Sequence, residues 1–143
     1  MRGPKTYLTA KLKGMRTNRL GWVLLTLVSV LLVGCLNPCG NRVLADIPSP
    51  LGTKHAVVFE RDCGATTDFS TQLSILNAGE KLESQAGNTF IADSNHGHVT
   101  SLYVRVKWSA ESSLEVNYPE PARVFHNERH VNGVSINYKP DGY

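Results

Sequence analysis

Four histidines are the side chains of this 143-residue chain best suited to metal binding or proton transfer. His96 and His98 lie two residues apart in a polar segment, and His126 and His130 are four apart in a segment predicted to form a strand. Residues four apart on a strand share one face. Because imidazole nitrogens are common metal ligands, either pair could contribute to a metal site. Solvated histidines are the simpler interpretation, so we expect no metal and no other cofactor.

A second group of polar side chains occurs in the sequence Arg61-Asp62-Cys63-Gly64-Ala65-Thr66-Thr67. Connections between strands often carry binding groups, so Arg61, Asp62, Thr66 and Thr67 form a candidate ligand-binding loop. Asp and Thr also cap turns through their own backbone. An exposed Arg–Asp pair contributes about 1 kcal/mol or less. A purely structural role for this loop is therefore the simpler interpretation.

Strands separated by turn residues must position these groups. From Lys54 onward the apolar residues alternate with polar ones or form short β-branched runs, and no window has a sustained helical period. The clearest alternation is in Ser101–Trp108, where the even-numbered residues form an apolar face. Asn132-Gly133 tolerates positive φ at both central positions of a type I′ hairpin turn. The predicted strands are 55–60, 69–76, 88–92, 101–108, 114–118, 123–131 and 134–138.

Short strands joined mostly by short links predict an all-β domain. The expected architecture is a small antiparallel sandwich, barrel or meander of about six to seven strands. Residues 51–143 are long enough for one such domain with its own core. Prolines and a glycine interrupt the preceding residues, and we therefore predict an irregular tether there, with the domain itself beginning at residue 51.

An uncharged apolar run from Leu20 to Gly34 follows a basic segment without acidic residues. This layout is typical of a secretory signal. As a helix the run would be about 22 Å long, short for a hydrocarbon core of about 30 Å. We therefore predict a signal peptide over residues 1–34, with an N-terminal signal helix. Met15 is an alternative start to Met1, because it would give a more compact signal.

The run ends in Leu32-Val33-Gly34-Cys35, which resembles the lipobox of bacterial lipoprotein signals. The resemblance implies that the chain is cleaved between Gly34 and Cys35 and that Cys35 becomes the first mature residue. Acyl chains such as palmitate on Cys35 would then anchor the protein to the membrane. Residues 35–50 would be the lipidated cysteine and the tether. Leu36 after the cysteine favours the outer membrane if the host has one. The alternative is an uncleaved single-span anchor in the inner membrane.

With Cys35 lipidated, two cysteines remain in an oxidising compartment, and we predict a Cys39–Cys63 disulfide. The alternative leaves Cys63 as a free thiol, with Cys39 pairing between chains. A nucleophilic Cys63 would need a base, and His55 or His96 could supply one.

The charge of the chain depends on its leader. Six of the 15 basic residues and none of the 12 acidic residues precede Cys35, which leaves 9 basic against 12 acidic residues and a net charge of −3. The remaining chain has no basic run and no basic residues interleaved with aromatic ones. Nucleic-acid binding needs such a basic footprint, so this class is excluded.

The Arg-Asp-Cys-Gly-Ala-Thr-Thr segment, together with Phe69-Ser70-Thr71-Gln72 and the strand that ends in Trp108, resembles a family of small bacterial envelope proteins, secreted or lipid-anchored, of uncharacterised function. The resemblance implies no activity.

Two classes of function remain after these exclusions. Phosphate loops, a Gly-x-Ser-x-Gly elbow and a His-Glu-x-x-His motif are missing from the sequence, which favours a non-enzymatic module. We expect a membrane-anchored lipoprotein that binds an envelope protein, a glycan or a small ligand. The alternative is a small envelope enzyme or metal-dependent factor that uses His96/His98 or His126/His130. The partner, the host and the oligomeric state are not encoded in any recognisable pattern.

Overall fold

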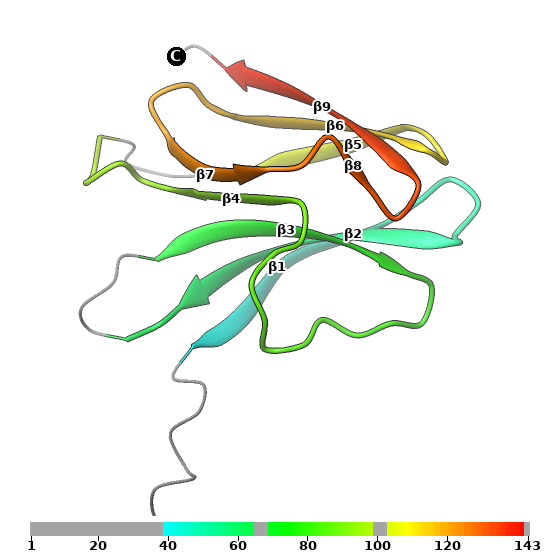
Figure 1. The fold of residues 1–143 in the computed structure, drawn as a ribbon, viewed down its shortest axis with the longest axis horizontal. Helices are drawn as coiled ribbons and strands as arrows, with labels where there is room; N and C mark the ends of the chain where they lie inside the picture. Colours follow the sequence, from blue (N-terminus) through cyan, green and yellow to red (C-terminus); the bar gives the residue numbers. More distant parts are fainter. Residues whose placement is uncertain (1–38, 65–68, 99–102, 142–143) are drawn as a thin grey trace, which may run out of the picture. The chain divides into compact units, whose positions relative to one another are not determined.

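The computed structural model describes residues 39–64, 69–98 and 103–141 (Figure 1). These ranges contain nine strands and no helix, so the all-β prediction is confirmed. The predicted signal peptide and Cys35 lie outside the described residues. The strands are β1 (Gly40–Pro48), β2 (Lys54–Asp62), β3 (Ser70–Asn77), β4 (Phe90–Asp93), β5 (Arg105–Ala110), β6 (Ser113–Pro119), β7 (Arg123–Asn127), β8 (His130–Val131) and β9 (Val134–Asp141).

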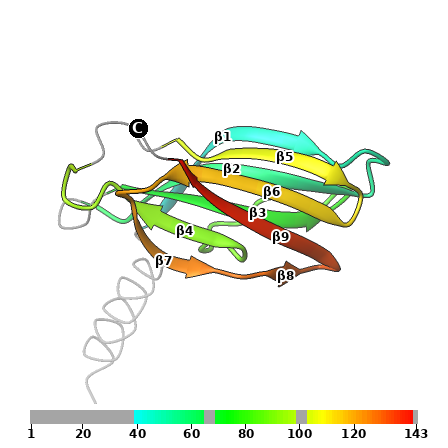
Figure 2. The ribbon, with the colours of Figure 1, turned by 90° about the horizontal axis from the view of Figure 1, so that it is seen from above.

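The strands form two sheets packed face to face, a sandwich rather than a closed barrel. One sheet has the order β1-β2-β3-β4-β7 and the other the order β5-β6-β9-β8. Figure 2 shows β1 and β5 along one side of the sandwich and β7 and β8 along the other. All pairings are antiparallel except that of β6 with β9, which is parallel. The prediction of an antiparallel domain missed this pair. After β6 the chain runs back through β7 and β8, so β9 has the same direction as β6.

Strand β1 corrects the predicted tether. Residues 40–48 form an edge strand that pairs along its length with β2. The compact unit therefore starts well before residue 51. A β-bulge at Leu44 explains the missed strand: Val43 shares a face with Phe59 on the outer side of the sheet, whereas Ala45 and Ile47 beyond the bulge pack against the core. A bulge breaks the period-two alternation by which strands are recognised.

The core lies between the sheets and is built from the alternating apolar residues of both. Phe90 at its centre is fully buried, and its ring centroid lies 5.1 Å from that of Tyr118 and 5.6 Å from that of Tyr138. Aromatic pairs at such distances add to the stability that burial itself provides. The other fully buried core residues are Ala56, Leu73, Ile75, Ala92, Leu114, Val116 and Val134.

The sequence pattern of 101–108 holds where the structure describes it. Val104 is buried, Val106 and Trp108 are half-buried, and the residues between them are exposed. Strand β5 itself begins at Arg105, and residues 101 and 102 lie outside the described residues. Trp108 packs against the core and donates its indole N–H to the carbonyl of Ile47 at 3.1 Å, which links the edge strands of the two sheets.

Residues 80–88, which we name the strap, cross the outer face of the five-stranded sheet (Figure 1). Phe59, Gln72 and Ser74 on that face are buried, although they point away from the core between the sheets. The backbone N–H of Gly87 donates to Gln72 Oε1 at 2.6 Å. A Cβ on Gly87 would lie 2.8 Å from the Leu73 carbonyl oxygen, so this contact requires glycine.

The two ends of the sandwich are named here by one residue each. The Cys39 end carries the start of β1 and the end of β2, and the Leu51 end carries the turn between them. At the Leu51 end, Glu111 accepts hydrogen bonds from Thr53 Oγ1, from the Leu51 N–H at 2.7 Å and from Ser49 Oγ at 2.7 Å. These bonds, that from Thr53 first, lower the pKa of Glu111 to about 2. Glu111 thereby joins a turn of one sheet to a turn of the other.

Candidate functional site

Polar residues from every strand of the five-stranded sheet line up at the Cys39 end. Arg61 lies opposite Asn41 on β1 and opposite Ser70 on β3, Ser70 lies opposite Asp93, and Asp93 lies opposite Arg123. Directly opposed residues of antiparallel strands have side chains on one face. The five residues therefore form a continuous row across the outer face, beyond the edge of the strap.

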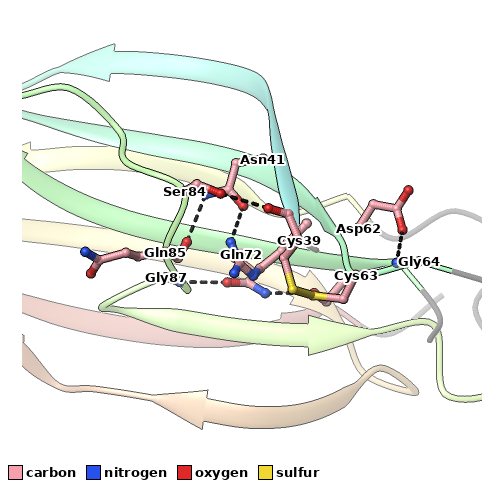
Figure 3. Close-up of a disulfide and its surroundings, with 11 residues drawn as sticks. Cys39, Asn41, Asp62, Cys63, Gly64, Gln72, Ser84, Gln85 and Gly87 are labelled. Atoms are coloured by element: carbon pink, nitrogen blue, oxygen red, sulfur yellow. Dashed lines mark hydrogen bonds between the residues drawn. A yellow bond between two sulfur atoms is a disulfide. The ribbon is translucent and has the colours of Figure 1, made fainter. Parts of the chain in front are cut away.

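The Cys39–Cys63 disulfide closes the β1–β2 hairpin at this end (Figure 3). The two Cα atoms are 3.9 Å apart. Ser84 of the strap donates its hydroxyl to the Cys39 carbonyl oxygen at 2.8 Å, so the disulfide also lies against the strap. The predicted pairing is confirmed, and the free Cys63 thiol that a nucleophilic role requires is not present in this oxidised form.

The candidate ligand-binding loop is only partly described. Arg61 is half-buried and donates from Nη1 to Asn41 Oδ1 at 2.7 Å. Asp62 is exposed and accepts the N–H of Gly64 at 2.8 Å. Both side chains therefore make the turn-forming and cross-strand bonds of a structural role. Thr66 and Thr67 lie outside the described residues.

Asn41 connects the row to the strap. Its side-chain amide donates to the carbonyl oxygens of Glu83 at 2.9 Å and Gln85 at 2.8 Å, while its oxygen accepts from Arg61. Figure 3 shows Asn41, Ser84 and Gln85 beside the disulfide. Asn41 lies in the predicted tether, so sequence reasoning missed this residue.

Arg123 is the centre of a small cluster at the other side of the row. Its guanidinium pairs with the buried carboxylate of Asp93 and lies 4.8 Å from the ring centroid of Phe125. Its Nη1 is 3.0 Å from Nε2 of His96, which sits in a turn with φ of 50° at Asn95 and 55° at His96. Burial favours a raised pKa for Asp93, but the hydrogen bonds from Arg123 and from the Asn95 N–H outweigh it and lower that pKa.

The predicted histidine pairs do not assemble into metal sites. His126 belongs to β7 in one sheet and His130 to β8 in the other, because the predicted strand 123–131 switches sheets between them. The expectation that they share one face is therefore wrong. His98 is exposed in the turn that carries His96. Among the described residues, no three His, Cys, Asp or Glu side chains are grouped as a metal site requires.

A surface pocket of about 470 Å³ opens at the Cys39 end beside the first residues of β1. Its size falls in the usual range for ligand pockets. Asp62 of the candidate loop and the exposed ring of Phe69 line it, as does the ion pair of Arg42 with Glu60 at 3.0 Å. The remaining lining residues are Gly40, Asn41 and Gly64.

An exposed aliphatic pair lies on the edge strand β1. Val43 is 53% exposed and Leu44, the bulged residue, is 45% exposed. In the described chain β1 has a strand neighbour on one side only. Sequence reasoning missed this surface, and the uninterrupted run Val43-Leu44-Ala45 between polar residues was the only signal for it.

Comparisons with family models, with curated proteins and with solved structures give no match for this chain. In the part of the chain that the structure describes, no helix is long and apolar enough to cross a membrane.

Proposed function

We propose that this chain is an exported lipoprotein, anchored through acyl chains on Cys35, whose sandwich binds an envelope partner without catalysing a reaction. The Cys39–Cys63 disulfide supports export, because such bonds persist in oxidising compartments and are rare in the cytosol. The apolar run that ends in Leu32-Val33-Gly34-Cys35 supports lipidation. The membrane is the outer one if the host has two.

The observation that carries the binding role is the exposed pair Val43 and Leu44 on β1. Contiguous exposed apolar surface marks interaction sites, and these two side chains are adjacent in the chain on an edge strand. The bulge at Leu44 and the Trp108 cap on Ile47 protect this edge against simple strand addition. The partner therefore docks on the side chains, and their apolar character favours a protein over a glycan or a small polar ligand.

The anchor is tested by metabolic labelling with a radioactive fatty acid. The wild-type protein should incorporate the label and sediment with membranes, whereas Cys35→Ala should lose the label and either leave the membrane fraction or accumulate uncleaved. A wild-type protein that remains unlabelled and still sediments with membranes would instead support an uncleaved span.

The binding surface is tested by placing a photo-crosslinking amino acid at Leu44 in the full chain, expressed in its own host. A matched control carries the same group at Leu51, which is 76% exposed in the turn beyond the end of β1. The Leu44 probe should give a discrete adduct that Val43→Asp abolishes. Adducts that are equal at both positions, or that survive Val43→Asp, contradict the proposal.

A further inference from the structure

We propose that the Cys39 end of the sandwich rests on the lipid bilayer, with the exposed rings of Phe69 and Tyr103 in the interfacial layer. This inference rests on the proposed lipidation of Cys35. It goes beyond that proposal because it fixes which end of the domain meets the membrane, and it leaves the Val43–Leu44 surface on the side of the domain for a partner.

The length of chain between the anchor and the domain is the first argument. Cys39 follows Cys35 by four residues, and consecutive Cα atoms are about 3.8 Å apart, so the two Cα atoms are at most about 15 Å apart. The predicted tether of residues 35–50 would have allowed far more distance, but residues 40–48 belong to β1.

The disulfide makes this short connection rigid at its far end. Cys39 is covalently joined to Cys63, which directly follows β2. Strand β1 therefore cannot peel away from β2 at this end to lengthen the connection while the disulfide is intact. A lipid-linked Cys35 holds the Cys39 end within about 15 Å of the membrane surface, about the depth of one headgroup layer and a few water molecules.

The second argument is the position of the exposed aromatic side chains. Phe69 immediately precedes β3 at the Cys39 end and is 57% exposed. Tyr103 is 55% exposed and precedes β5. Strand β5 ends next to Glu111, which is bonded to the turn at the Leu51 end, so β5 starts at the Cys39 end. Tyr and Trp rings are favoured at the level of the lipid headgroups, and Phe is common on apolar faces that lie at the boundary between headgroups and acyl chains.

The charges at this end are mostly compensated. Arg42 pairs with Glu60, Arg105 with Asp141, and Arg123 with Asp93. The contact with lipid therefore does not depend on anionic headgroups. We expect it on zwitterionic vesicles, with little change between low and high salt.

The test uses the mature, lipid-carrying protein, which begins at Cys35 and has Trp108 as its one native tryptophan, reconstituted in phosphatidylcholine vesicles whose acyl chains carry bromine, a short-range quencher of tryptophan. Phe69→Trp places the reporter at the Cys39 end, and Leu51→Trp is the matched control at the opposite end. The wild-type signal of Trp108 is subtracted from both. After subtraction, Phe69→Trp should be quenched at least about twofold more strongly than Leu51→Trp, as expected for a ring at the interface.

The mass of each purified protein separates the two proposals. If Cys35 carries lipid and the two reporters are quenched equally or not at all, the orientation is wrong and the lipoprotein proposal stands. If Cys35 carries no lipid, both fail. Circular dichroism must match the wild type; should Phe69→Trp not fold, Tyr103→Trp takes its place with the same expected ratio and the same refuting result.

Discussion

Removal of the Cys39–Cys63 disulfide should destabilise the domain more than the loss of any single exposed contact. The bond spans a sequence separation of 24 residues. In the chain-entropy model, closing a loop of about 25 residues stabilises the folded state by about 3.5 kcal/mol at 25 °C. Domains of this size are stable by only about 5–15 kcal/mol in total, so this is a large share. For about 100 residues it corresponds to a fall in melting temperature of about 15 °C.

The perturbation is the double variant Cys39→Ser/Cys63→Ser, compared with the wild type by thermal unfolding followed in the far-ultraviolet circular dichroism. A single substitution would leave one reactive thiol, so the double variant is the cleaner comparison. The wild type in the presence of a reductant is the matched control, because it removes the same bond without changing either side chain to serine. The variant and the wild type with reductant should have the same melting temperature, about 15 °C below that of the oxidised wild type. Reductant should not change the melting temperature of the variant.

Two results would refute this reasoning. If the double variant melts within about 3 °C of the oxidised wild type, the hydrogen bonds of β1 to β2 already restrict the chain and the loop-closure argument fails. If alkylation of the denatured exported protein without reductant adds two groups to a monomer, the native protein holds no such bond.

Three further predictions concern the strap, the sheet-connecting carboxylate and the core. Gly87→Ala should destabilise the domain by about 1–3 kcal/mol in urea unfolding, because the new Cβ meets the backbone of β3, whereas Gly40→Ala, with no atom within 4 Å of the added Cβ, should change it by less than about 0.5 kcal/mol. Glu111 has a pKa of about 2 in the folded state against an ordinary 4.5, so its contribution to the free energy of unfolding is complete above about pH 5 and declines as the pH falls towards 2. The stability of Glu111→Gln should therefore fall less than that of the wild type between about pH 5 and pH 2. Parallel pH profiles of the two proteins would contradict this. Phe90→Ala should destabilise the domain by about 3–5 kcal/mol, because it leaves a cavity at the centre of the core. Phe125→Ala, at an exposed position, should destabilise it by less than about 1 kcal/mol. Equal losses in the two variants would contradict a core centred on Phe90.

The features that the sequence by itself determined are local ones. The alternation through Val104, Val106 and Trp108 predicted one inward and one outward face, and the structure has both. The turn at Asn132-Gly133 has positive φ at both residues, 50° and 75°, as a type I′ turn requires. These patterns act over a few residues of one chain segment, so no distant partner is needed to read them.

The cysteine count predicted the disulfide for a similar reason. Once Cys35 is assigned to the lipid, Cys39 and Cys63 have one intramolecular pairing available, and no geometry is needed to choose it. The function of the chain has no such signal. The histidine spacings suggested metal pairs that the structure does not assemble, and the proposed binding role rests instead on an exposed surface.

The tertiary structure decided everything that depends on a distant neighbour. The bulge at Leu44 shifts the alternation of β1, so only pairing with β2 reveals this strand. His126 and His130 separate because the chain changes sheets between them, a step without a signature in the hydrophobic period. Gln72 is buried because residues 80–88 cover it. In each case burial and partnership are set by residues far away in sequence, whereas a sequence pattern records only the preference of a segment for one face.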